Sequence, residues 1–187
     1  MRVISGIARG THLACVDEDF VRPTLDRVKE SLFNMIQTRI LDATVLDLFA
    51  GSGALGIECL SRGAKQAVFC DKSPKCINII KQNLKKTKFE EKACILNKDF
   101  KKCLEILAKD KKVFDILFVD PPYKLDLAGQ AVESIIALGL LSEDGIIILE
   151  TDEKQRDLKH MENLKVQVLQ ERKYGRVSLI FLNSKGA

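Results

Sequence analysis

The chain has 187 residues, 46% of them hydrophobic, and a formal net charge of +4 at pH 7. This composition is typical of one ordinary globular domain with a small appendage, and the weak positive charge is compatible with a polyanionic partner without requiring one. No apolar run approaches the ~20 residues of a membrane span, and the amino terminus lacks the long apolar segment of a secretory signal, so we expect a cytoplasmic protein with no membrane contact. The six cysteines and two histidines form no C-x-x-C pair and no zinc-site spacing, so we expect no metal.

The first 43 residues are predicted to form an N-terminal extension. Residues 1–15 contain Arg9 among glycines and β-branched residues and have no acid, which indicates a hairpin. This hairpin could contact nucleic acid through Arg9 or serve structure alone, and the sequence leaves both open. Apolar residues then recur at helical spacing from Thr24 to Ile40, which predicts an amphipathic helix.

From residue 44 onward, short apolar runs alternate with helical segments, the pattern of a parallel sheet. The predicted strands are Thr44–Phe49, Gln66–Asp71, Ala93–Asn97, Phe114–Val119 and Ile146–Glu150. Beyond them we expect a closing antiparallel hairpin of Val166–Leu169 and Val177–Leu182, joined through residues 172–176. The sequence therefore predicts a single α/β domain (1–187), with an extension (1–43) and a Rossmann-like core (44–187).

A glycine turn follows the first predicted strand, in the run Asp47 to Gly56. Gly51, Gly53 and Gly56 have the spacing that lets backbone amides and a helix start approach a nucleotide-type cofactor. Asp71 stands at the end of the next strand, where an acid can accept both ribose hydroxyls. These features fit NAD and S-adenosylmethionine alike. A tight turn without cofactor, in which Asp71 caps a helix, is the alternative.

Other side chains at the strand ends complete the predicted cofactor site. Asp47 and Phe49 belong to the glycine turn itself. Asp99 follows the third strand and can accept from an adenine amino group, or else cap the helix that starts at Phe100. We include Asp47, Phe49, Asp99 and Phe100 in the predicted site.

The fourth strand ends in Asp120-Pro121-Pro122-Tyr123. Two prolines stop the ladder and leave an acid and an aromatic ring at the carboxyl end of the strand, where open α/β sheets bind ligands. The Asp120 carboxylate and the Pro121 carbonyl can accept hydrogen bonds from an exocyclic amino group and weaken the conjugation of its lone pair, while Tyr123 stacks on the base. Because hydride transfer has no evident use for this motif, it favours methyl transfer, with a plain strand terminator as the alternative.

These motifs resemble one known family, the bacterial 16S ribosomal RNA guanine-N(2) methyltransferases of RsmD type, within the class I methyltransferases that use S-adenosylmethionine. The resemblance covers nearly the whole chain. It depends on Arg9-Gly10, Arg22-Pro23-Thr24, Asp26 to Glu30, Leu32-Phe33-Asn34, Phe49 to Gly56, Asp120 to Tyr123 and Tyr174-Gly175. The Asp-Pro-Pro-Tyr motif occurs in several amino-methylating families, whereas the Arg-Pro-Thr-x-x-Arg-Val block is far more specific.

The resemblance implies a Rossmann-like sheet of seven strands, mostly parallel with an antiparallel last strand, plus the N-terminal hairpin and helix. It implies cofactor contacts from Gly51, Gly53, Asp71 and Asp99, with Thr24 near the amino-acid end of the cofactor. It also implies that Asp120 to Tyr123 hold a flipped guanine of 16S ribosomal RNA, presented within the assembled or assembling small ribosomal subunit.

Three arginines are predicted to contact RNA: Arg9, Arg22 and Arg27. Arg22 and Arg27 could instead face the cofactor carboxylate, and Arg27 could pair with an acid on its own helix. Where members of the family often have arginine after the valine of the block, this chain has Lys29, which lacks the fork for bidentate phosphate contact.

Alternative functions differ in kind. An NAD-dependent oxidoreductase would need a proton donor, and we expect His12 and His160 outside the sheet's crevice. An inactive ribosome-binding module would not need both Asp120 and the glycine turn. A DNA adenine methyltransferase, or one acting on another amino group, shares the Asp-Pro-Pro-Tyr pocket, yet the DNA enzymes usually carry a separate target-recognition region. The exact nucleotide, the oligomeric state and the affinity do not follow from the sequence.

Overall fold

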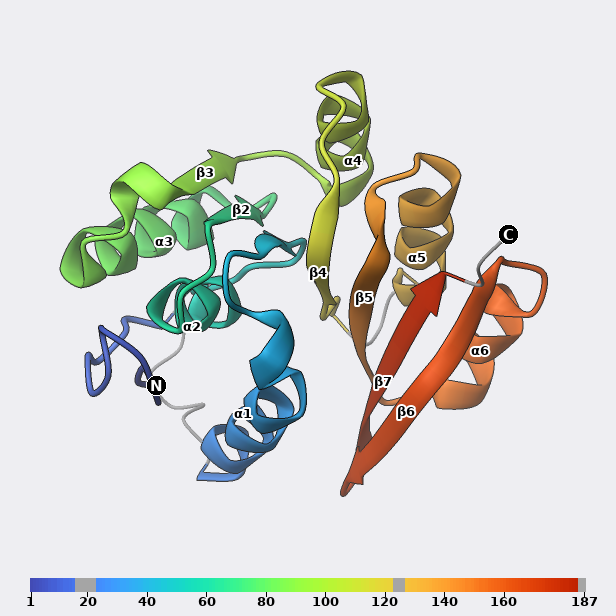
Figure 1. Ribbon diagram of the computed structural model, residues 1–187, viewed down its shortest axis with the longest axis horizontal. Helices are drawn as coiled ribbons and strands as arrows, with labels where there is room; N and C mark the ends of the chain where they lie inside the picture. The colour runs from blue at the N-terminus through green and yellow to red at the C-terminus, as the bar shows by residue number, and fades with distance from the viewer. Residues whose placement is uncertain (16–22, 123–126, 185–187) are drawn as a thin grey trace. The chain divides into compact units, whose positions relative to one another are not determined.

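The computed structural model describes residues 1–15, 23–122 and 127–184, and for residues 23–27 the backbone alone. The chain divides into two compact units, Met1–Lys98 and Asp99–Ala187. Figure 1 labels the elements of both. The predicted single domain with a boundary at residue 43 stays a prediction.

In its described part, the first unit alternates strands and helices as predicted. Its helices are α1 (Pro23–Ile36), α2 (Ala54–Ser61) and α3 (Pro74–Thr87), with short 3-10 turns at Gln37–Arg39 and Glu90–Lys92. Its strands are β1 (Thr44–Asp47), β2 (Gln66–Cys70) and β3 (Ala93–Leu96), which pair in parallel in the order β3-β2-β1. Parallel pairing brings the carboxyl ends of these strands, and the residues that follow them, to one edge.

Local signals explain where the helices of this unit lie. Gly56 allows α2 to pack on β2, because a Cβ there would lie 2.4 Å from the ring of Phe69. Ser73 caps α3 by accepting a hydrogen bond from the Cys76 amide at 3.4 Å, and Pro74 occupies the first helical position. The predicted cap and helix start are confirmed.

The N-terminal segment, residues 1–15, doubles back on itself without forming a strand ladder. Its pairing is one isolated antiparallel bridge between Arg2 and His12, supported by hydrogen bonds from Val3 N to Thr11 O (3.0 Å) and from Gly10 N to Val3 O (2.9 Å). The predicted hairpin is therefore present in a reduced form.

In its described part, the second unit contains strands that pair both in parallel and antiparallel. Its helices are α4 (Phe100–Lys109), α5 (Ala128–Ala137) and α6 (Lys154–Met161). Its strands are β4 (Phe114–Val119), β5 (Leu141–Thr151), β6 (Val166–Tyr174) and β7 (Val177–Ser184), in the order β4-β5-β7-β6. β4 and β5 pair in parallel, and β7 runs antiparallel to both of its neighbours, which gives the antiparallel last strand that was expected.

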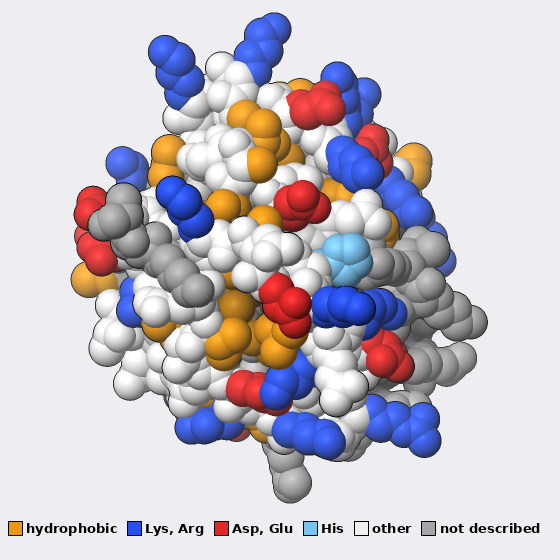
Figure 2. Space-filling model, turned by 90° about the vertical axis from the view of Figure 1, so that its right-hand side faces the viewer, with side chains coloured by type: hydrophobic (Ala, Val, Ile, Leu, Met, Phe, Trp, Pro, Cys, Tyr) orange, Lys and Arg blue, Asp and Glu red, His pale blue; other side chains and the backbone are white. Residues whose placement is uncertain are grey.

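On the side that carries β6 and α6, basic and acidic side chains are interspersed (Figure 2). Among the helices described, none is both long and apolar enough to cross a bilayer. Within the same residues, no group of three or more histidine, cysteine, aspartate or glutamate side chains could hold a metal ion.

Candidate active site

The glycine turn after β1 is built from backbone hydrogen bonds and left-handed glycines. Gly51 and Gly53 have φ angles of 54° and 76°, which residues with a Cβ rarely adopt. The Gly53 amide donates to Ala50 O at 2.6 Å, and the Ala50 amide donates to Cys70 O at 2.9 Å, which ties the turn to β2. A Cβ on Gly51 would meet no atom within 4 Å. The turn therefore presents its backbone to open space at Gly51, as a cradle for a nucleotide-type ligand requires.

Asp71 lies beside this turn, directly after β2. Its Oδ2 accepts from the Gly51 amide at 2.9 Å and its Oδ1 accepts from the Ser73 amide at 2.8 Å. Because each carboxylate oxygen has a second lone pair, both oxygens retain the capacity to accept from ribose hydroxyls. The structure thus brings Asp71 and Gly51 together, while the ribose contact itself stays a prediction.

Asp47 lies beneath the turn at the end of β1, with 3% of its surface exposed. Its Oδ2 accepts from the Gly56 amide at 3.1 Å, so it fixes the start of α2. Burial, with a smaller contribution from the negative charge of Asp71, raises the pKa of Asp47 to about 7, although the Gly56 hydrogen bond opposes this shift. Phe49, in the same turn, is half-buried. Cofactor contacts of Asp47 and Phe49 stay predictions.

Asp99 and Phe100 open the second unit. Asp99 is exposed and caps α4, because its Oδ1 accepts from the Lys102 amide at 3.2 Å. Phe100 is buried at the first position of that helix. The capping alternative for Asp99 is therefore present, and contact with adenine stays a prediction for both residues.

The acidic corner, Asp120-Pro121-Pro122, follows the last residue of β4 as predicted. Asp120 is half-buried, Pro121 is buried and Pro122 is exposed, while Tyr123 lies outside the described residues. The two prolines line a cavity of about 10 Å³ together with Ala128, Glu150, Thr151, Asp152, Arg156 and Asp157. This space suits a single water molecule. The geometry places an acid and a rigid carbonyl at the strand end, where both can accept hydrogen bonds.

The predicted RNA contacts are only partly described. Arg9 is exposed in the N-terminal segment. Arg22 lies outside the described residues. Thr24 and Arg27 lie near the start of α1, and their side chains are likewise outside the description.

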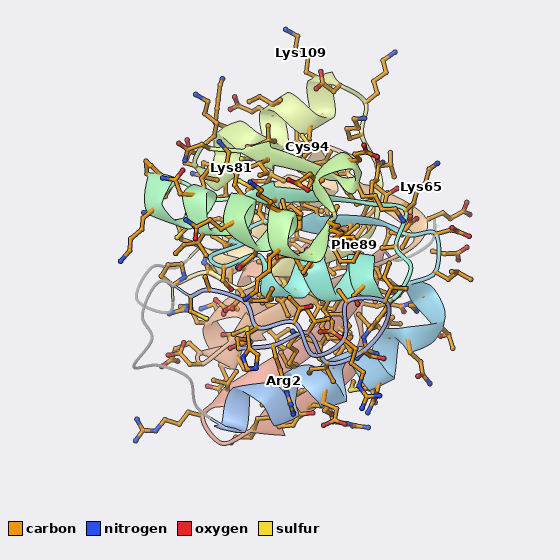
Figure 3. All side chains as sticks on the ribbon, turned by 90° about the vertical axis from the view of Figure 1, so that its left-hand side faces the viewer. Arg2, Lys65, Lys81, Phe89, Cys94 and Lys109 are labelled. Atoms are coloured by element: carbon orange, nitrogen blue, oxygen red, sulfur yellow. The ribbon has the colours of Figure 1, made fainter. Side chains whose placement is uncertain are left out.

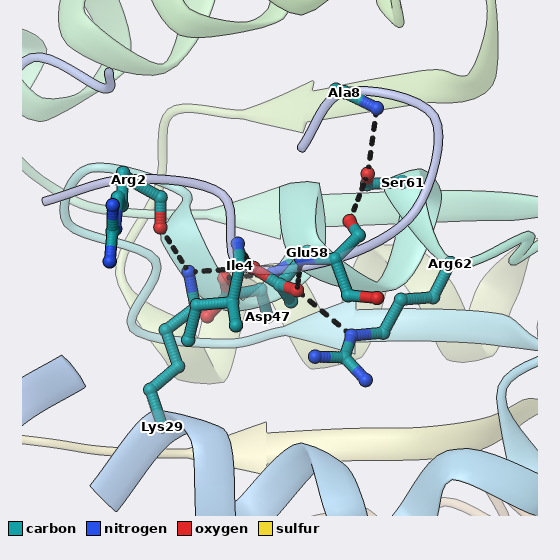
Figure 4. Close-up of polar contacts among 10 residues, drawn as sticks. Arg2, Ile4, Ala8, Lys29, Asp47, Glu58, Ser61 and Arg62 are labelled. Atoms are coloured by element: carbon teal, nitrogen blue, oxygen red, sulfur yellow. Dashed lines mark hydrogen bonds and ion pairs between the residues drawn. The ribbon is translucent and has the colours of Figure 1, made fainter. Parts of the chain in front are cut away.

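Sequence reasoning missed Glu58, which is fully buried on α2 and anchors the N-terminal segment (Figure 4). Its carboxylate accepts from the amides of Ile4 (2.8 Å) and Ser5 (3.0 Å). It also pairs with Lys29 Nζ (2.9 Å) and Arg62 Nε (2.8 Å). Burial raises the pKa of Glu58, but Lys29, the Ile4 amide and Arg62 together outweigh burial and hold it below its usual value.

The same contacts settle the role of Lys29. Its side chain is 6% exposed, and its ammonium also donates to Arg2 O at 3.1 Å. Lys29 therefore joins α1 to the N-terminal segment and to α2, and it is not available for a phosphate.

A second missed residue is Asn83 on α3, buried at 1% exposure. Both residues carried a signal in the sequence. Glu58 is the lone charge in the otherwise uncharged helix Ala54–Ser61, and Asn83 interrupts the apolar face that contains Ile80 and Leu84. A polar group on a buried face demands partners, but periodicity does not say which.

The strand orders and the glycine turn define a class of protein, the Rossmann-like methyltransferases. The solved structure of the Escherichia coli protein yhhF covers 100% of this chain and 99% of its own, with a TM-score of 0.83 and 30% identity. SMU.776, solved in complex with SAH, covers 80% of this chain and 48% of its own at 15% identity and a TM-score of 0.66, a likeness in fold alone. The predicted fold class, seven strands with an antiparallel last strand, is confirmed.

The chain belongs to the family described as Conserved hypothetical protein 95, whose model matches residues 1–183. The "Ribosomal RNA small subunit methyltransferase D" of Haemophilus influenzae is 38% identical to it over 87% of this chain and 84% of that protein. YlbH of Bacillus subtilis is 43% identical over 81% of this chain and 83% of its own. The predicted family is confirmed, and with it the enzyme class of methyltransferase.

Proposed function

We propose that the protein transfers a methyl group from S-adenosylmethionine to the exocyclic amino group of a guanine in 16S ribosomal RNA. One observation carries this proposal. This chain has an Asp-Pro-Pro corner directly after β4, and its relatives include a "Ribosomal RNA small subunit methyltransferase D". That corner supplies the two acceptors that an amino group needs.

On the cofactor side, the proposed groups are those of the first unit, together with Asp99 and Phe100 at the start of the second. The backbone at Gly51 and Gly53 would approach the cofactor, Asp71 would accept from its ribose, and Thr24 would lie near its amino-acid end. Asp47 and Phe49 would support or contact this site, and Asp99 and Phe100 would face the adenine. The bound cofactor supplies a methyl group on a sulfonium, which is already a good electrophile, so the protein contributes positioning.

On the acceptor side, the chemistry concerns a poor nucleophile. The lone pair of a guanine amino group is delocalised into the ring. Hydrogen bonds to the Asp120 carboxylate and the Pro121 carbonyl would favour a nitrogen whose lone pair points away from the ring plane. Pro122 fixes the backbone, and Tyr123 would stack on the flipped base, a contact worth about 1–3 kcal/mol.

The RNA would be held by Arg9, Arg22 and Arg27 through its phosphates. One small chain offers limited surface for RNA, so we propose that the small ribosomal subunit, assembled or assembling, presents the guanine. No step of this reaction requires a metal. Such a substrate also implies that the protein works in the bacterial cytoplasm.

Transfer of labelled methyl groups to assembled small subunits and to protein-free 16S ribosomal RNA tests the proposal, followed by mapping of the modified base. We expect label on a guanine N2 with subunits as substrate, and little label on naked RNA. Asp120→Ala should abolish the label, whereas Asp110→Ala, which removes an exposed acid of the same unit, should not.

Three other results would each replace the proposal. Label on adenine in DNA would identify a DNA methyltransferase. Binding of subunits without any transfer would identify an inactive module. Reduction or oxidation of a substrate with NAD would identify an oxidoreductase.

A further inference from the structure

The carboxamide of Asn83 lies between two parts of the first unit that are distant in sequence. Asn83 is on α3, and its side chain points into the buried side of the helix, where just 1% of the residue is exposed. On one side is Ala14 of the N-terminal segment, and on the other is Ser52, the residue between the two left-handed glycines of the turn. Figure 3 shows the N-terminal segment running between α1 and α3.

Asn83 makes three hydrogen bonds, and two of them use both N–H donors of its amide. Asn83 Oδ1 accepts from Ala14 N at 2.8 Å, and Nδ2 donates to Ala14 O at 3.0 Å and to Ser52 O at 2.9 Å. The amide therefore pairs with both backbone groups of Ala14 as a neighbouring peptide would, and its remaining N–H holds the glycine turn. Because the group is buried, losing either partner leaves a polar atom without compensation.

The N-terminal segment depends on such side chains because it has a single bridge of its own. Glu58 accepts from Ile4 and Ser5, and Lys86 Nζ donates to His12 O. Between these anchors, Arg9 remains exposed to solvent. The segment is thus fixed from α1, α2 and α3, and of these described anchors Asn83 also reaches the turn.

We propose that Asn83 is a positioning residue that couples RNA binding at the N-terminal segment to cofactor binding at the glycine turn. This inference rests on the proposed function. Two states define the coupling. In the attached state Asn83 binds Ala14 and Ser52 together, and in the detached state Ala14 is released to water and the turn loses a fixed partner. RNA on the segment and cofactor on the turn both favour the attached state, so each strengthens the binding of the other by the same factor.

Couplings of this kind usually amount to a factor of about 5–150 in affinity. The test is the affinity for S-adenosylhomocysteine, measured by calorimetry with and without saturating small ribosomal subunits. For the unmodified protein we expect subunits to tighten this affinity at least fivefold. In Asn83→Asp, which keeps the acceptor for Ala14 N and loses both donations, we expect the affinity without subunits to fall about tenfold and the tightening to vanish.

A matched control comes from the same helix. Asn78 is exposed on α3, so Asn78→Asp makes the same chemical change without touching either partner, and it should behave as the unmodified protein. At saturating cofactor and RNA, kcat of Asn83→Asp should change less than threefold while KM for both ligands rises. A loss in kcat at unchanged KM would overturn the positioning role.

A second variant changes the N-terminal partner of Asn83 and leaves Asn83 itself intact. Ala14→Pro deletes the N–H that donates to Asn83 Oδ1 and leaves the glycine turn unaltered. Weaker S-adenosylhomocysteine binding in this variant supports the coupling, and unchanged binding in both variants overturns it. An unmodified protein that binds no S-adenosylhomocysteine and transfers no methyl group would instead contradict the proposed function.

Discussion

The glycine turn of the first unit and the acidic corner of the second both follow a parallel strand, yet they are held in different ways. The carboxylates of Asp71 and Asp47 accept hydrogen bonds from the Gly51 and Gly56 amides, and the Asn83 amide donates one to Ser52 O, so side chains from three different elements or their ends fix the turn. The corner is fixed covalently by the rings of Pro121 and Pro122. Because several side chains support the turn, removing one of them should lower the cofactor affinity only in part. Because the carboxylate of Asp120 itself takes part in the proposed chemistry, removing it should lower kcat strongly.

The largest expected effect is on the corner. Asp120→Ala should lower kcat about 100-fold or more, because it removes one of the two acceptors for the amino group in the transition state. Affinity for S-adenosylhomocysteine should stay within twofold, since the residue acts on the acceptor. Single-turnover methyl transfer and calorimetry measure the two quantities. Equal losses in both would show that the corner belongs to the cofactor site and would break the comparison.

The next effect concerns the turn. Asp71→Ala removes the acceptor for the Gly51 and Ser73 amides and the predicted partner of the ribose, so the affinity for S-adenosylhomocysteine should fall about 10- to 100-fold. At saturating cofactor the rate should recover to within a few-fold. Glu91→Ala, an exposed acid of the same unit, is the control. Failure of the rate to recover would mean that Asp71 also serves the chemical step.

An effect of another kind, on stability and not on cofactor affinity, tests the anchor of the N-terminal segment. Glu58→Gln leaves Lys29 and Arg62 beside a neutral group, and breaking a buried pair usually costs about 3–5 kcal/mol. We expect a loss in the free energy of unfolding of this order by urea titration, with little change in cofactor affinity of the folded protein. Glu105→Gln removes an exposed partner of Lys102 and should leave stability unchanged. Similar results for the two variants would mean that Glu58 is not an anchor.

Local signals were sufficient for the strands that end in a special residue. β4 was predicted as Phe114–Val119 and observed so, because a run that is apolar apart from Asp115 is followed by Asp120 and two prolines. β5 begins at Leu141, five residues before the predicted Ile146. Leu141 pairs with Phe114, the register then shifts across the polar run Ser142 to Gly145, which resembles a turn in the sequence, and pairing resumes between Ile146 and Ile116. The predicted connection 172–176 was wrong, since β6 continues to Tyr174 along β7. Its polar composition fits an edge strand.

The candidate site divides in the same way. Gly51, Asp71 and Asp120 could be predicted as site residues because their chemistry depends on order along the chain. Asn83 and Glu58 were missed because their partners, Ala14 and Ile4, lie more than 50 residues away in sequence. A single sequence indicates that a buried polar side chain requires a hydrogen-bond partner, but only the folded structure identifies that partner.

A dependence of stability on pH distinguishes two buried carboxylates of the first unit. Burial raises the pKa of Asp47 to about 7, so between about pH 4 and pH 7 the folded protein keeps a proton that the unfolded chain releases. Its contribution to the free energy of unfolding therefore falls as pH rises through that window and is constant above it. Glu58 has a lowered pKa, so its contribution is complete above the ordinary value near 4.5 and is lost as pH falls through the folded value.

The opposite pH dependences that Asp47 and Glu58 give to the free energy of unfolding can be separated by urea unfolding at pH 5, 6, 7 and 8. Asp47→Asn keeps an acceptor for the Gly56 amide and removes the titration, so its free energy of unfolding relative to the unmodified protein should rise from pH 5 to pH 7 and then level off. For Glu58→Gln the difference should be flat over this range, because its window lies at lower pH. A flat difference for Asp47→Asn would show that Asp47 is ionised throughout.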